Sequence, residues 1–169
     1  MGIIRPIILF QLLCAAGASA MVGPSRQDLQ ESINLVHTTH GMIECITAQY
    51  HRIPLGTITF YTTDACDQWH LLDVKVASNV RNRGVGTQLI HACLHFIAQY
   101  PCQSISWHAQ PDDKSISLKD LKQFYKSTLS AAQHILPGTL VTTRVIGHYR
   151  MHYCVANAHL VQWYRCNTV

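Results

Sequence analysis

Residues 76–90 read VASNVRNRGVGTQLI. An apolar run ends at Val76, a polar segment rich in Asn, Arg and Gly follows, and the glycines precede an apolar-faced helix. A glycine-rich turn at a helix N-terminus presents successive backbone N–H groups and the positive end of the helix dipole, so it is suited to bind an anion. Two glycines alone are also typical of an ordinary tight turn.

The loop combines small residues with fixed positive charge. Gly84 and Gly86 leave room for a phosphate to approach the backbone, and Arg81 and Arg83 place guanidinium groups beside it. The glycine spacing differs from that of a dinucleotide-binding Rossmann turn, and no Lys-Ser/Thr pair follows as in a P-loop. The anion site predicted here comprises Arg81, Asn82, Arg83, Gly84, Val85, Gly86 and Thr87.

Strand-like runs precede this loop. Runs 42–51, 57–63 and 69–76 are rich in apolar and β-branched residues, and turns are expected at 54–56 and 64–68. These spacings predict an antiparallel meander. In the third run, period-two alternation places Leu72, Val74 and Val76 on one face and Leu71, Asp73 and Lys75 on the other.

Helices and strands follow the loop. Leu89, Ile90, Cys93, Leu94 and Ile97 recur at helical spacing on one face of a helix that Pro101 ends. The remaining predicted elements are a helix over 25–36 ended by Gly41, a strand over 103–109, a helix capped by Ser117 with Leu118, Leu121, Tyr125 and Leu129 on one face, strands over 140–146 and 148–155, and a further strand over 159–166.

This order of elements is a mixed α+β pattern. The 169 residues, 48% hydrophobic and 13% charged, predict one compact domain. A net charge of +4 favours a polyanionic ligand such as a nucleotide cofactor but is too small to indicate DNA wrapping, so no specific DNA binding is expected. The cysteines form no Cys-x-x-Cys pair and the histidines no His-Glu-x-x-His pattern, so no metal site is predicted.

Residues 76–90 closely resemble the acetyl-CoA segment of GNAT acyltransferases: an apolar strand ending in Val, a short loop, then Arg/Gln-x-x-Gly-x-Gly/Ala opening an apolar helix. Arg81, Gly84 and Gly86 match this pattern residue by residue. The resemblance implies a GNAT-like α+β fold, with a mixed, mostly antiparallel central sheet flanked by helices. It also implies an N-acetyltransferase that moves an acetyl group from acetyl-CoA to an amine by direct attack in a ternary complex.

The same resemblance implies where the cofactor arm lies. Backbone groups of Val74, Lys75 and Val76 are expected to pair with the pantetheine, and the N–H of Val76 to donate to the thioester oxygen. A splay between this strand and the next would admit the cofactor. The acceptor amine stays open: a small molecule, a lysine or N-terminus of a protein, or an aminoacyl-tRNA.

Residues 121–126, LKQFYK, resemble a later helix of the family, which commonly carries an aliphatic-Tyr pair followed by a charged residue. The tyrosine protonates the departing CoA thiolate in many members, which implies this role for Tyr125. A core tyrosine on an amphipathic helix is the other interpretation. The sequence departs from the family where Leu118 and Leu121 replace the usual Asn and Ala, and the Gly-Phe that usually follows is missing.

Two residues are candidates for the general base. Asp73 lies on the strand before the loop, and His108 lies near the end of the strand after the first helix, at about the place where some relatives carry a basic carboxylate. Imidazole titrates near neutrality and suits this task. Either residue could equally be structural, and a chain of water molecules could replace both.

Residues 1–22 form a separate N-terminal segment, and 23–169 the predicted GNAT-like domain. Arg5, the apolar run 7–16 and Ala18-Ser19-Ala20 outline a secretory signal peptide. Three alternatives remain: Met21 is the true start, the segment is a buried strand and helix, or it is an uncleaved anchor. Because acetyl-CoA is an intracellular metabolite, a cytoplasmic location is predicted, with export through a signal ending near Ala20 as the alternative.

Two other functions are compatible with the sequence. The domain could be a non-catalytic acyl-CoA-binding module, which the irregular helix around Tyr125 favours. It could also be a secreted, disulfide-stapled interaction protein, because removal of the N-terminal segment, and Cys14 with it, leaves six of the seven cysteines.

Overall fold

The computed structural model describes residues 27, 29, 32–62, 68–100, 102–111, 116–145 and 148–155. The N-terminal segment and the predicted strand 159–166 lie outside these residues. The elements are β1 (Asn34–His40), β2 (Ile43–Tyr50), β3 (Ile53–Thr62), β4 (Gln68–Val76), the 3₁₀ turn η1 (Ser78–Val80), α2 (Val85–Ile97), β5 (Ser104–His108), α3 (Leu118–Ala131), β6 (Gly138–Val145) and β7 (His148–Val155).

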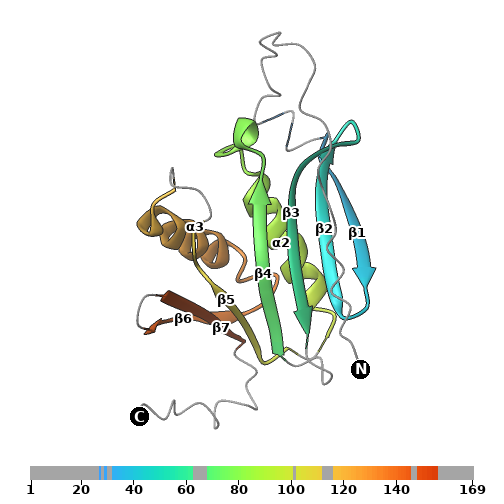
Figure 1. The fold of residues 1–169 in the computed structure, drawn as a ribbon. Helices are drawn as coiled ribbons and strands as arrows, with labels where there is room; N and C mark the ends of the chain where they lie inside the picture. The colour runs from blue at the N-terminus through green and yellow to red at the C-terminus, as the bar shows by residue number, and fades with distance from the viewer. Residues whose placement is uncertain are drawn as a thin grey trace, which may run out of the picture.

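The strands form one seven-stranded sheet in the order β1-β2-β3-β4-β5-β7-β6. Every neighbouring pair is antiparallel except β4 and β5, which are parallel. Figure 1 shows α2 crossing behind β3 and β4, and α3 beside the β5–β7 part of the sheet. The α+β fold with a mixed, mostly antiparallel sheet, and the meander before the loop, are therefore confirmed.

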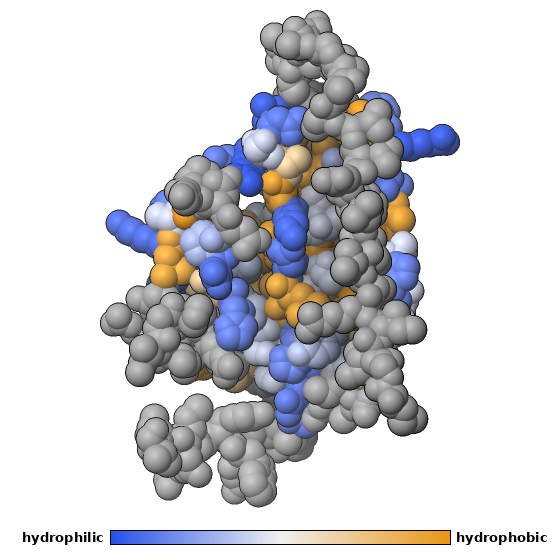
Figure 2. All heavy atoms as spheres, in the orientation of Figure 1, coloured by the Kyte–Doolittle hydropathy of each residue, from blue (hydrophilic) through white to orange (hydrophobic). Residues whose placement is uncertain are grey.

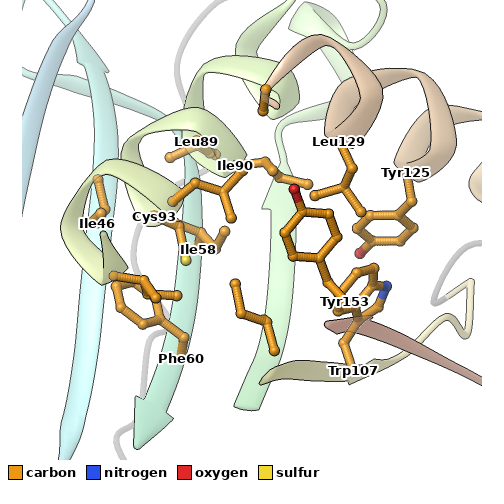
Figure 3. Packing of buried hydrophobic residues seen from close by; sticks show 14 of the residues in the cluster. Ile46, Ile58, Phe60, Leu89, Ile90, Cys93, Trp107, Tyr125, Leu129 and Tyr153 are labelled. Carbon is orange, nitrogen blue, oxygen red and sulfur yellow. The ribbon is translucent and has the colours of Figure 1, made fainter. Parts of the chain in front are cut away.

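The core lies between α2, α3 and one face of the sheet. The predicted apolar face of α2 is buried in full, and Figure 3 shows Leu89, Ile90 and Cys93 turned toward Ile46 and Ile58 of β2 and β3. Each such side chain contributes about 1.5–3 kcal/mol of transfer free energy on burial. This packing fixes the N-terminus of α2 at the end of β4.

The β2–β3 connection differs from the prediction. The turn is at His51 and Arg52, which both have positive φ (49° and 67°), and not at 54–56. Two successive positive φ values are the signature of a type I′ hairpin turn. Asn-Gly usually marks such a turn, and this pair is absent here. Gly56 instead serves close strand approach, because a Cβ there would lie 2.5 Å from the carbonyl oxygen of Lys75.

The predicted helix over 25–36 extends too far. Gln27, Leu29 and Ser32 are helical, but β1 begins at Asn34 and pairs with β2 along its whole length. Residues 34–40, NLVHTTH, contain the β-branched residues that favour a strand once a partner is present. Gly41 makes the following hairpin turn with φ 64° and does not end a helix.

A β-bulge interrupts β4. Thr59 pairs with Asp73 and Phe60 with Leu71, so Leu72 is an extra residue, and it is 54% exposed. Because a bulge shifts the alternation by one, Leu71 and Val74 both pack against the core. The prediction that Leu72 shares a face with Val74 and Val76 was therefore wrong.

Candidate active site

The sheet opens between β4 and β5. Their parallel ladder extends only from the pair Gln68–Ser104 to the pair Leu71–Trp107, whereas β4 continues to Val76 on its pairing with β3. Figure 1 shows the two strands diverging toward the end of β4 that leads into the loop. The expected splay is thus present at the predicted place.

Hydrogen bonds to β3 fix which way the backbone of β4 points. The N–H of Ala77 donates to Leu55 O at 2.8 Å, so Ala77 and, two residues earlier, Lys75 turn their polar backbone groups toward β3. Val74 and Val76 therefore turn theirs toward the opening. In agreement, Arg81 Nε donates to Val76 O at 3.3 Å from that side.

The loop ends in an open helix N-terminus. Asn82 and Gly84 have φ values of 61° and 92°, and Gly84 is the N-cap of α2. The first intrahelical bond is from Gln88 N to Gly84 O, so the N–H groups of the three residues before Gln88 have no intrahelical acceptor. Glycine has no side chain to cap them, and the first turn carries no acidic residue. This is a suitable site for an anion: the amides of Val85, Gly86 and Thr87 with the helix dipole behind them.

The two loop glycines serve different purposes. At Gly84 the positive φ favours glycine, and a Cβ would enter open space. At Gly86 a Cβ would lie 3.2 Å from Phe124 Cζ and 3.6 Å from Val76 Cγ2. Gly86 therefore lets α3 approach the start of α2, in addition to the phosphate access expected from the sequence.

A cleft of about 1680 Å³ connects the loop to the opening between the strands. This volume exceeds the range of about 300–1,000 Å³ that is typical of pockets for one small ligand. Every predicted site residue except Arg83 lines it: Asp73, Val74, Lys75, Val76, Arg81, Asn82, Gly84, Val85, Gly86, Thr87, His108 and Tyr125.

The predicted acid and the candidate bases lie on opposite faces of the sheet. Tyr125 is buried, and its ring centroid is 5.2 Å from that of Trp107, on the face that α3 covers. His108 follows Trp107 in β5, so its side chain points to the other face. Asp73 and Lys75 alternate with Val74 and Val76 and also lie there. Figure 2 is drawn from the side opposite α2 and shows hydrophilic and hydrophobic residues along β4.

Asp73 is the more constrained of the two candidate bases. Its carboxylate forms an ion pair with Lys75 Nζ at 2.5 Å, and the Lys75 side chain is largely exposed. His108 is exposed at the end of β5. The two residues occupy the two strands that border the opening, so either can face an acceptor that enters between them.

Several lining residues were not predicted from the sequence. Trp107 and Phe124 belong to elements that the sequence did predict, but only the pairing of β5 with β4 and the contact of α3 with α2 bring them to the cleft. Trp107 is 4% exposed, and its Nε1 is buried with no hydrogen-bond acceptor among the described residues. Period-two alternation in 103–109 was the available signal, since it turns Ile105 and Trp107 to the same face.

Other expectations concern metals, cysteines and membranes. Within the described residues, no group of three or more His, Cys, Asp or Glu side chains could hold a metal ion. The four described cysteines, Cys45, Cys93, Cys102 and Cys154, are not in disulfide bonds, and Cys14, Cys66 and Cys166 lie outside the described residues. No helix in the described part of the chain is both long and apolar enough to cross a membrane.

A family model for the acetyltransferase (GNAT) family matches residues 15–121. The chain belongs to this family. It is accordingly a GNAT-type acyltransferase, and the cleft between β4 and β5 is its candidate active site. No curated protein matches the sequence at a significant level.

Solved GNAT structures share the fold. An aminoglycoside 6′-acetyltransferase type Ii is similar with a TM-score of 0.51 and 15% identity, over 68% of this chain and 70% of that one. The PaiA N-acetyltransferase from Thermoplasma acidophilum, in complex with coenzyme A, gives 0.50 and 11%, over 66% and 60%. The anti-CRISPR protein AcrVA5 is 26% identical over 57% of this chain and 87% of that one, with a TM-score of 0.44.

Proposed function

We propose that this GNAT protein is an N-acetyltransferase that moves an acetyl group from acetyl-CoA to an amine by direct attack in a ternary complex. The observation that carries the proposal is the continuous cleft from an open helix N-terminus to the gap between β4 and β5. The amides of Val85, Gly86 and Thr87 would bind the pyrophosphate. The cleft-facing backbone groups of Val74 and Val76 would then pair with the pantetheine arm.

The placement of acid and base on opposite faces supports direct transfer. The acceptor would enter from the face of Asp73 and His108, and one of these, or a water molecule, would take a proton from its amine. The amine nitrogen would attack the thioester carbonyl carbon while the N–H of Val76 donates to the oxygen. The carbon–sulfur bond would then break, and Tyr125 would give its proton to the sulfur.

The acceptor and the location belong to the same proposal. The one acidic side chain on the β4 border of the gap, Asp73, is ion-paired with Lys75, so the opening carries little net charge there. A small amine, a protein amine and an aminoacyl-tRNA are all compatible with such an opening. We place the reaction in the cytoplasm, where acetyl-CoA is available.

The loop can be tested with one added charge and a matched control. Asn82→Asp changes one atom type, and Asp tolerates the positive φ at this position as Asn does. Two unit charges 4 Å apart repel by about 1 kcal/mol in water and about 4 kcal/mol at a protein surface, so acetyl-CoA should bind at least about fivefold more weakly. Calorimetry measures this change in Kd.

Asn79→Asp is the control. Asn79 is exposed in η1 and does not line the cleft, and its substitution alters the net charge equally. Its Kd should change less than that of Asn82→Asp, because the added charge does not line the cleft and 0.15 M salt screens charges at the surface. Equal weakening by both substitutions would show a general charge effect. Absence of acetyl-CoA binding by the unsubstituted protein would contradict the proposed function.

A further inference from the structure

Trp107, a residue outside the predicted site, lines the closed end of the cleft. We propose that Trp107 is the end wall of the acyl pocket and restricts this enzyme to short acyl groups. The inference rests on the proposed function, because it concerns the acyl donor that the same cleft would bind. Three features carry it: the direction of the cleft, the fixed position of Trp107 and the size of its side chain.

The direction of the cleft brings the acyl end to Trp107. The anion site at the start of α2 holds one end of the ligand, and the cleft-facing backbone at Val76 and Val74 leads inward from it. The two strands meet again at the pair Leu71–Trp107. A ligand that follows β4 from the loop therefore ends against these two side chains, and both line the cleft.

Trp107 cannot withdraw from this position. Its backbone is paired on one side with Leu71 of β4 and on the other with Met151 of β7. The indole is 4% exposed and packs against Tyr125, and Figure 3 shows Tyr153 next to both rings. Because Met151 and Tyr153 are themselves fully buried, a longer acyl chain could displace the indole only by disturbing the core.

The size of the Trp107 side chain is the property that matters at this position. The buried Nε1–H has no acceptor among the described residues, and a purely apolar side chain here would avoid the cost of that unpaired donor. Hydrogen bonding to the described residues thus does not account for tryptophan at this place. A large, flat side chain at the point where the gap closes leaves space for a short acyl group only.

The test compares Kd values and turnover for acetyl-, butyryl- and hexanoyl-CoA. The unsubstituted protein should bind hexanoyl-CoA at least tenfold more weakly than acetyl-CoA. In Trp107→Leu the order should reverse, because each methylene that enters an apolar pocket tightens binding by about fourfold. Trp107→Phe removes the N–H but keeps most of the bulk, so it should retain the preference for acetyl-CoA.

Trp69→Leu is the matched control. Trp69 is 2% exposed on β4 and packs with Phe96 and Tyr100 away from the cleft, so its loss weakens packing without opening the acyl pocket. Its preference for acetyl-CoA should be unchanged. If Trp107→Leu does not fold, as thermal unfolding would show, Trp107→Met enlarges the pocket less and gives the same comparison.

The inference would be overturned by hexanoyl-CoA bound as tightly as acetyl-CoA by the unsubstituted protein, or by an unchanged chain-length preference in the folded Trp107→Leu or Trp107→Met variant. A reversal in Trp69→Leu as well would also overturn it, because the effect would then come from loosened packing. Failure of the unsubstituted protein to bind any acyl-CoA is a separate outcome. It would contradict the proposed function itself.

Discussion

Tyr125 is either the general acid or a core tyrosine, and its surroundings fit both interpretations. It is buried between Trp107 and Phe124, as a core tyrosine would be, and it lines the cleft, as a general acid must. Substitution by phenylalanine separates the two roles, since the ring and its packing stay while the proton is lost.

We expect Tyr125→Phe to lower turnover by roughly 100- to 10,000-fold, the usual contribution of one general acid. The Kd for acetyl-CoA should stay nearly unchanged, because the ring contact with Trp107 is kept, and the basic limb of the pH–rate profile should move. Steady-state kinetics and calorimetry provide the two readouts. Unaltered turnover, measured where chemistry limits the rate, would remove Tyr125 from the mechanism, and an unfolded variant would indicate a structural hydroxyl.

At the scale of elements, the contact between the start of α2 and α3 sets the shape of the cleft. Gly86→Ala would place a methyl group 3.2 Å from Phe124 Cζ, so the ring or the helix must move. Overpacking costs about 1–3 kcal/mol, and the higher helix propensity of alanine offsets up to about 1 kcal/mol of it. We expect a net loss of up to about 2 kcal/mol in chemical denaturation, together with weaker acetyl-CoA binding.

The partner substitution provides the control for this contact. Phe124→Leu removes the ring that the methyl group meets, so the double variant Gly86→Ala/Phe124→Leu should be more stable than the sum of the single effects predicts. Strict additivity of the two losses would show that the methyl group and the ring do not meet.

The sequence predicted those elements whose signals are local. The apolar face of α2 and the cap Ser117 of α3 were readable because helical spacing and capping act within a few residues. The turn at His51 and Arg52 was not, since the Asn-Gly or Asp-Gly pair that usually marks a two-residue hairpin turn is absent there. The bulge at Leu72 depends on the register with β3, which a single strand does not encode.

At the scale of the whole molecule, α2 and α3 pack together over one face of the sheet and hold His91 between them. Burial lowers the pKa of His91 below its usual 6.5, with a hydrogen bond to the Thr128 backbone opposing the shift and His134 and His95 adding to it. At a pH between the folded and the unfolded pKa, the His91 imidazole is therefore protonated in the unfolded chain and neutral in the folded protein. This contribution to stability is complete above about pH 6.5 and is lost as the pH falls through the folded pKa.

We expect His91→Gln to reduce the fall in unfolding free energy between pH 6.5 and pH 5, because glutamine does not titrate. His95→Gln, at an exposed position of the same helix, should leave most of that fall in place. Urea denaturation at several pH values measures both slopes. An equal pH dependence in His91→Gln and the unsubstituted protein would show that His91 is not the group responsible.

The site was predictable where one continuous segment supplies it. Residues 73–76 and 81–87 are a single strand–loop–helix unit, and all of them except Arg83 line the cleft. Trp107 and Phe124 come from other elements, and their position depends on how β5 and α3 are placed against that unit. Such long-range placement results from packing of the complete sheet, so the chain-length limit that we assign to Trp107 had no counterpart in the sequence.

The short β4–β5 ladder has one more consequence. It joins the two halves of the sheet like a pivot, because the strands are bonded at Leu71–Trp107 and apart beyond it. A small rotation of one half about this pivot moves the mouth of the cleft by the largest amount and the closed end hardly at all. Widening of the mouth for an acceptor therefore leaves the residues at the closed end in place.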